Sequence, residues 1–200
     1  MRVALLCLYC LSAACSGSGD SELVGDDIND VPSGIIDQPF DDSSSQDAPE
    51  LEGFVEAHNV ERAAVDATPP LAPLTWSTVL ANYAQEWVDE LVRRGCVIGH
   101  RPDEGEFKRI YGESTVWYSV SLGKEKADAV AFWAGEKQYY DAENHTCESG
   151  KICGHYTQMV WRDTQQLGCA TARCTPAGED ERQIWVCNYD PRGNTGAVPF

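Results

Sequence analysis

The stretch Cys153-Gly154-His155-Tyr156-Thr157-Gln158-Met159-Val160-Trp161 places a cysteine and a glycine directly before a histidine, and an aromatic run that ends on tryptophan follows. Glycine lets the backbone turn sharply, so we expect the imidazole of His155 at a turn that water can reach. The aromatic residues after His155 favour a β-strand. Because a single histidine is more often structural than chemical, the stretch needs support from the rest of the chain.

A second stretch, Ile184–Asn194 (IWVCNYDPRGN), combines an aromatic strand with Pro and Gly-Asn turn residues. Together the two stretches resemble the signature motifs of the CAP superfamily, which includes cysteine-rich secretory proteins, insect venom antigens and plant pathogenesis-related proteins of the first class. The similarity runs from about Glu52 to Phe200 and is greatest to the plant members. Further segments that carry it are His58–Arg62 (HNVER), Asn82–Gln85 (NYAQ) and Glu136–Asp141 (EKQYYD).

Length, charge and cysteine content narrow the class of protein. Two hundred residues suit one domain with an appendage. A formal net charge of −17 argues against a nucleic-acid or anionic-membrane partner, because such surfaces attract Lys and Arg. Ser16–Glu50 holds ten acidic residues and no Lys or Arg, so the remainder is only moderately acidic. Nine cysteines indicate an oxidising compartment. We expect an extracellular or outer-surface monomer.

Residues 1–15 have the pattern of a secretion signal. A positive start precedes an apolar core at 3–11 (VALLCLYCL), which is shorter than the ~20 apolar residues of a transmembrane helix. Residues 11–15 (LSAAC) resemble a bacterial lipobox, in which Cys15 becomes the lipidated amino terminus. Lipidation at Cys15 and removal of the leader would leave six cysteines, an even number for disulfides. We expect a lipoprotein, anchored to a membrane only through Cys15. Cleavage by ordinary signal peptidase and free secretion is the alternative.

The segment 16–49 is rich in Ser, Gly and Asp and poor in aromatic residues. Such a segment buries too little apolar area to offset its chain entropy, which predicts a disordered acidic linker. It would hold a domain at 50–200 away from a membrane, or it would be an acidic tail without ligand chemistry.

Periodicity within the domain predicts helices over 51–66, 78–94 and 124–141, and strands over 112–117, 167–173 and 183–189. Ser77 is a natural N-cap for the second helix, and Gly95 is suited to end it. His58 shares an apolar helical face with Phe54, so we expect it to be structural. Periodicity alone predicts an α+β protein. The resemblance implies a three-layer α-β-α sandwich with a small, mainly antiparallel sheet.

The six cysteines of the domain allow fifteen connectivities. The resemblance to the plant members selects three pairs: Cys96–Cys174, Cys147–Cys153 and Cys169–Cys187. Each bridge should add ~2–4 kcal/mol of stability. Zinc coordination by cysteine is disfavoured because the one Cys-x-x-Cys spacing, Cys7 to Cys10, lies in the leader.

Carried over residue by residue, His100, Glu113, Glu136 and His155 match the family's cleft tetrad, whose imidazoles can bind a divalent metal, often zinc. His100 and His155 would be the ligands, and the two glutamates would orient the rings or polarise a bound water. Two protein ligands are fewer than the three typical of catalytic zinc, so we expect weak binding. The alternative is a buried polar network that ties four elements together. Arg101 replaces the serine usual in relatives, so we expect altered hydrogen bonding beside His100.

The leading expectation is a non-enzymatic binding module for a small lipid, sterol-like or other apolar ligand, or for an extracellular protein. A metal-dependent hydrolase or protease with Glu113 or Glu136 as base is the first alternative, and a purely structural surface protein is the second. Serine proteolysis is disfavoured, because Ser114 follows Glu113 on a strand and the two should face opposite sides. The tail Pro191–Phe200 resembles a segment released as a signalling peptide from plant members; we expect it to fix the C-terminus around the sheet.

Overall fold

A four-stranded sheet runs through the domain in the order β1-β5-β6-β2. In this computed structural model residue 51 and residues 53–200 are described, so the predictions for residues 1–15 and 16–49 lie outside the described residues. The strands are β1 (Thr75–Trp76), β5 (Gln166–Cys174), β6 (Arg182–Asp190) and β2 (Gly112–Ser119). β1 is parallel to β5, and the other two pairings are antiparallel. β2 is therefore an edge strand.

One face of the sheet is covered by α2 (Thr78–Arg93), the helix that periodicity predicted over 78–94. The hydroxyl of Ser77 accepts a hydrogen bond from the backbone N–H of Leu80 at 3.4 Å, which confirms the predicted N-cap. A Cβ on Gly168 of β5 would lie 2.5 Å from the Ser77 carbonyl oxygen, so only glycine allows this close approach. The core between α2 and the sheet consists mainly of Ala84, Trp87, Val88, Leu91, Ala170, Ile184 and Val186.

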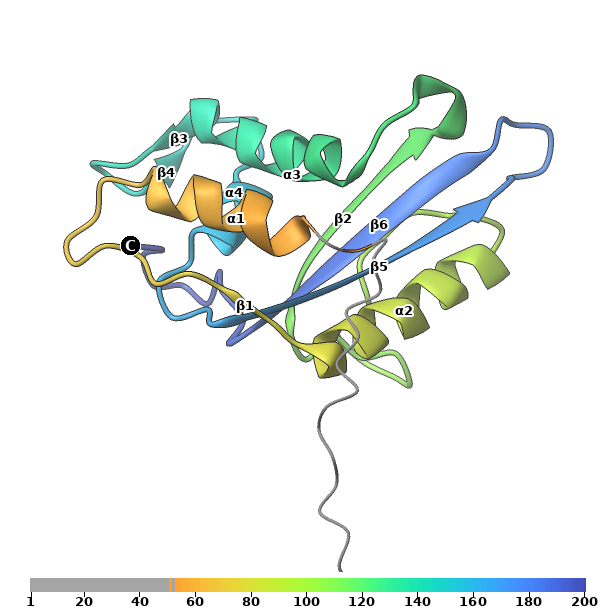
Figure 1. Cartoon of the computed structure of the whole chain (residues 1–200), viewed down its shortest axis with the longest axis horizontal. Helices are drawn as coiled ribbons and strands as arrows, with labels where there is room; N and C mark the ends of the chain where they lie inside the picture. The colour runs from red at the N-terminus through yellow and green to blue at the C-terminus, as the bar shows by residue number, and fades with distance from the viewer. Residues whose placement is uncertain (1–50, 52) are drawn as a thin grey trace, which may run out of the picture. The chain divides into compact units, whose positions relative to one another are not determined.

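The opposite face is covered by α1 (Phe54–Ala63), α3 (Lys126–Ala134) and α4 (Gly154–Met159). Figure 1 shows these three helices on one side of the sheet and α2 on the other. The predicted three-layer α+β fold is confirmed.

His58 has the structural role that the sequence predicted. It lies in the core beside α3; its Nδ1–H donates to the Phe54 carbonyl at 2.7 Å, and Nε2 accepts from the Tyr189 hydroxyl at 2.9 Å. Burial lowers its pKa to about 4, so the ring is neutral at pH 7.

Two local predictions were wrong. The aromatic run after His155 forms the helix α4 rather than a strand, because Tyr156, Met159 and Val160 recur at helical spacing and enter the core together. The predicted helix 124–141 ends at Ala134 and continues as the 3₁₀-helix η3 (Gly135–Tyr139). A short hairpin of β3 (Tyr140–Asp141) and β4 (Thr146–Cys147) then follows. β2 continues two residues past the prediction and into a 3₁₀ turn, η2 (Val120–Leu122).

The structure contains the three disulfides that the resemblance implied: Cys96–Cys174, Cys147–Cys153 and Cys169–Cys187. The last joins register partners on neighbouring strands β5 and β6. Among residues 51 and 53–200, no helix is long and apolar enough to cross a bilayer.

Candidate functional site

The first imidazole–carboxylate pair joins the loop after α2 to strand β2. His100 Nδ1–H donates to Glu113 Oε1 at 2.8 Å, and the backbone N–H of Arg101 donates to the same oxygen at 3.0 Å. The Glu113 side chain is completely buried, whereas that of His100 is 42% exposed. The other oxygen, Glu113 Oε2, has no hydrogen-bond partner among the described residues. This pair therefore leaves one buried acceptor unused.

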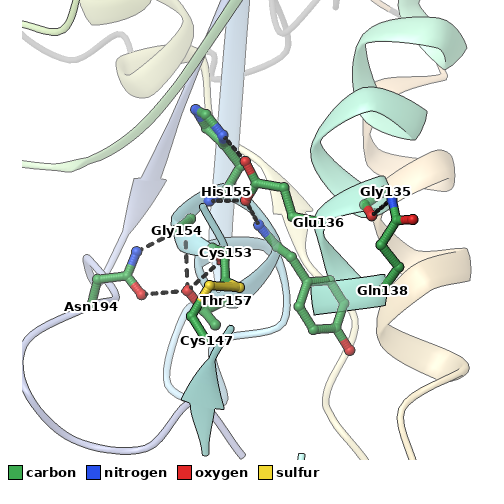
Figure 2. The surroundings of a disulfide bond; sticks show 10 residues. Gly135, Glu136, Gln138, Cys147, Cys153, Gly154, His155, Thr157 and Asn194 are labelled. Atoms are coloured by element: carbon green, nitrogen blue, oxygen red, sulfur yellow. Dashed lines mark hydrogen bonds and ion pairs between the residues drawn. A yellow bond between two sulfur atoms is a disulfide. The ribbon is translucent and has the colours of Figure 1, made fainter. Parts of the chain in front are cut away.

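The second pair joins η3 to the start of α4. His155 Nδ1–H donates to Glu136 Oε1 at 2.6 Å, while Glu136 Oε2 accepts the backbone N–H groups of His155 at 2.8 Å and Tyr156 at 3.2 Å. Figure 2 shows the Glu136 carboxylate between the ring and the helix end. A carboxylate at this position accepts hydrogen bonds from N–H groups that have no partner within the helix. Its negative charge also interacts favourably with the positive end of the helix dipole. Both Glu136 oxygens are thus in use.

A disulfide and the C-terminal tail hold the same helix end (Figure 2). Cys153, bridged to Cys147, immediately precedes α4. The Thr157 hydroxyl donates to Asn194 Oδ1 at 2.8 Å, and Asn194 Nδ2 donates to the Gly154 carbonyl at 2.9 Å. These contacts hold the tail at Asn194 to α4, whereas the sequence predicted that the tail would lie around the sheet.

The two imidazoles meet at the free edge of β2. Their ring centroids are 6.1 Å apart and their planes are inclined by 30°. Both rings line a cavity of about 420 Å³, whose other lining residues are Ile98, Gly99, Thr115, Val116, Trp117, Tyr118 and Phe132. Glu113 and Glu136 lie behind the rings and are not part of this lining. The structure thus brings together the four residues named from the sequence.

Arg101 contributes to the site in a way that the sequence did not predict. Its guanidinium carbon lies 3.6 Å from the centroid of the Tyr83 ring, and Nη2 donates to Glu86 Oε2 at 2.7 Å and to the Tyr83 carbonyl. The side chain is buried, so it anchors the loop that carries His100 onto α2. The replacement of serine by arginine was the only signal of this role.

Phe132 was also missed. It lies on α3 and is 52% exposed. A single exposed aromatic residue is common on protein surfaces, so the sequence carried no specific signal for Phe132.

Ser114 takes no part in the cavity. It is fully buried, and its register partner Cys187 belongs to the core beneath α1 and α3. Glu113 points to the opposite face, toward His100 and Arg101. Adjacent strand residues cannot share one side of a sheet, so Ser114 and Glu113 do not form a catalytic pair.

Comparison with known proteins identifies the class. Residues 55–189 match the family described as "CAP: Cysteine-rich secretory protein family", and the chain belongs to this family. It is 39% identical over 148 residues to pathogenesis-related protein 1C of Nicotiana tabacum, covering 74% of this chain and 79% of the relative. It is 40% identical over 154 residues to pathogenesis-related protein 1A1 of Solanum lycopersicum, covering 76% and 77%. More narrowly, it is a CAP-domain protein of the pathogenesis-related protein 1 type.

Solved structures share the fold. Venom allergen-like protein 4 of Schistosoma mansoni is 25% identical, with a TM-score of 0.51 over 70% of this chain and 87% of that protein. A structure described as NaASP2 with Zn2+ is 26% identical, with a TM-score of 0.50 over 70% of this chain and 78% of that one.

Proposed function

We propose that this protein is an extracellular, non-enzymatic binding module that takes a small amphipathic ligand, of the lipid or sterol class, at the edge of β2. One observation carries the proposal: both histidines open into a cavity whose remaining walls are largely apolar or aromatic. A hydroxyl or carboxylate on the ligand would bond to the imidazoles, while its apolar body would lie against Val116, Trp117 and Phe132. Concave, mostly apolar sites with a few convergent polar groups are typical of small-molecule binding.

Phe132 extends the apolar surface beyond the imidazoles. The ring lines the 420 Å³ cavity and also a second one of about 540 Å³, which includes Ala131, Tyr139 and Ile152. Phe132 and Ile152 are 52% and 67% exposed, so a bound hydrocarbon would remove both from water. Each Å² of apolar surface covered contributes roughly 25 cal/mol. A ligand with a chain or fused-ring body therefore suits this site better than a small polar one.

Ligand binding is the direct test, with native mass spectrometry and titration of cholesterol and a long-chain fatty acid into the purified protein. Phe132→Ser should weaken binding about tenfold, since a tenfold loss is about 1.4 kcal/mol and matches partial loss of a buried aromatic contact. Val60→Ser is the control, because Val60 is also an exposed apolar residue on a helix (67%) and lies outside the cavity lining. Absence of lipid binding, or an equal effect of both substitutions, would contradict the proposal.

We also propose that the cleft holds a divalent metal ion weakly. In each pair Nδ1–H donates to a carboxylate, which leaves the lone pair of Nε2 for an ion, the arrangement usual for metal-bound histidine. His100 and His155 would be the ligands, with water in the other positions. Two protein ligands are fewer than the three typical of catalytic zinc, so the binding would be weak. A bound ion would supply Lewis acidity to the polar end of a ligand.

Metal-dependent hydrolysis is the second candidate, and one observation favours it. Glu113, which accepts the Nδ1–H of His100, has a second oxygen that accepts no hydrogen bond from the described residues, so an unused acceptor lies next to a proposed metal ligand. Hydrolysis of an activated ester should then appear on addition of zinc and disappear in His100→Ala and in His155→Ala. Zinc-independent or absent turnover would rule this candidate out.

The site's location outside the cell rests on the three disulfides and on the family's description as secretory. We propose lipidation at Cys15 as the means of attachment. Mass spectrometry of the native amino terminus tests it: a diacylglyceryl mass on Cys15 supports a tether, and an unmodified terminus indicates free secretion.

A further inference from the structure

The outer edge of β2 presents main-chain groups that β6 does not use. The Val120 N–H donates to the Glu181 carbonyl at 2.8 Å, and these two residues continue the β2–β6 register. In an antiparallel ladder the bonded pairs alternate. Val116 and Tyr118, which lie four and two residues earlier, therefore bond to β6. The N–H and C=O groups of Thr115 and Trp117 point the other way, to the free edge.

Two side-chain contacts support this assignment independently. The Thr115 carbonyl accepts the indole N–H of Trp133 from α3 at 3.3 Å, so it is directed away from β6. The carbonyl of Ile184, the register partner of Trp117, accepts the Thr171 hydroxyl of β5 at 2.7 Å, so it is directed away from β2. With respect to residues 51 and 53–200, the free edge thus offers the Thr115 N–H and both main-chain groups of Trp117.

This edge lies between two hollows. Trp117 and Tyr118 line both the 420 Å³ cavity and another of about 640 Å³ at the far end of β2. Their side chains project to opposite faces of the sheet: Trp117 stacks under Arg182 at 3.9 Å, and Tyr118 packs on Trp185 and Phe132. The strand Gly112–Ser119 contains no Pro or Lys, the residues with which proteins commonly protect an edge.

Charge at the far hollow indicates what would bind there. The hollow is lined in part by Glu179, Asp180 and Arg182. Arg182 neutralises Glu179, whereas Asp180 has no ion-pair partner among residues 51 and 53–200. One acidic group beside the end of β2 therefore lacks a counter-charge, and a basic side chain would supply it.

We propose that the β2 edge binds an extended peptide segment, which adds antiparallel to β2 as a fifth strand and places a Lys or Arg near its amino-terminal end against Asp180. Main-chain hydrogen bonds would come from Thr115 and Trp117, and alternate side chains would enter the two hollows, the usual division of roles in strand addition. The ligand class differs from the lipid proposed above, and the inference stands whether or not lipid binds.

The test uses a displayed library of random 12-residue peptides selected on the full-length protein, followed by amide hydrogen exchange of the protein with and without a selected peptide. The Thr115 and Trp117 amides should exchange rapidly in the free protein and at least tenfold more slowly in the complex. The amides of Val116 and Tyr118, bonded to β6, should be protected in both. Selected peptides should be rich in β-branched residues and carry a Lys or Arg toward one end.

Variants separate main-chain pairing from other modes of binding. Thr115→Pro removes an outward N–H while leaving the β6 ladder intact, and it should weaken peptide binding about tenfold. N-methylation of alternate peptide residues gives the same test without altering the protein: one set should abolish binding and the intervening set should not. Asp180→Lys should weaken the binding of peptides that carry the basic residue.

Several outcomes would overturn the proposal: no peptide enriched over the matrix, peptides that bind without protecting Trp117, or equal effects of both N-methylated sets. Sedimentation showing that two copies of the chain pair through β2 would also overturn it. Failure of lipid binding would leave all of these measurements unchanged.

Discussion

The two imidazole–carboxylate pairs consist of the same residue types, but their glutamates differ in the hydrogen bonds that they make to the rest of the protein. Glu136 uses both oxygens to close the start of α4, so the His155 pair is part of the fold. Glu113 bonds through one oxygen to a loop, and its histidine is more exposed, 42% against 18% for His155. The same two residue types therefore serve mainly architecture on one side of the cavity and leave unused bonding capacity on the other. The identity of the four residues alone therefore does not determine the role of each pair.

The disulfides beside the two pairs give the largest expected difference. Cys96–Cys174, four residues before His100, spans 78 residues, whereas Cys147–Cys153 spans 6. Loop-closure entropy predicts a loss of about 4 kcal/mol for the Cys96→Ser/Cys174→Ser double variant and about 2 kcal/mol for Cys147→Ser/Cys153→Ser. Urea denaturation would measure both. Equal losses would contradict this: they would show that contacts at the start of α4, rather than loop closure, determine how much Cys147–Cys153 stabilises the protein.

His58, which is buried in the core, should make the stability of the protein depend on pH. Burial lowers the pKa of His58 to about 4, while the unfolded chain titrates near 6.5. The unfolded state therefore binds the proton first, and stability present above pH 6.5 is lost as the pH falls to 4. Through His58 the free energy of unfolding should fall by roughly 3 kcal/mol between pH 7 and pH 4. Unfolding free energies at pH 7 and pH 4 should differ less in His58→Phe than in the wild type; an identical pH dependence would contradict a neutral, buried His58.

The two glutamates should differ in their effect on stability. In Glu136→Gln the helix N–H groups would face either an amide NH₂ or a neutral, weaker acceptor in place of the carboxylate. We expect the free energy of unfolding to fall by about 2–3 kcal/mol. Glu113→Gln keeps one oxygen for His100 and Arg101 and changes an atom that had no partner, so the loss should be below about 1 kcal/mol. Thermal unfolding of the two variants makes the comparison directly. A larger loss at Glu113 would reverse the assignment of roles.

Sequence reasoning located the elements that carry their own signals. α2 has a long apolar periodicity, a serine cap and a terminating glycine, and it was predicted nearly to the residue. α4 was not, because six residues cannot stabilise a helix alone and its cap, Glu136, comes from another element. Local patterns contain no information about such a contact.

The site shows the same division. The four residues of the cleft came from the family resemblance, since nothing in their spacing brings His100 and His155 together. Their unequal environments, the buried Arg101 and the exposed Phe132 depend on packing between distant segments. The free edge of β2 follows from strand order, which no single strand encodes.

The central claim is that His100 and His155 form one site, and zinc titration followed by NMR of ¹⁵N-labelled imidazoles tests it most directly. We predict that the Nε2 signals of both rings shift together with a single weak affinity and a stoichiometry of one, that His58 does not respond, and that His100→Ala abolishes the shift of His155. Separate affinities for the two rings, or a His155 response unchanged in His100→Ala, would contradict the account.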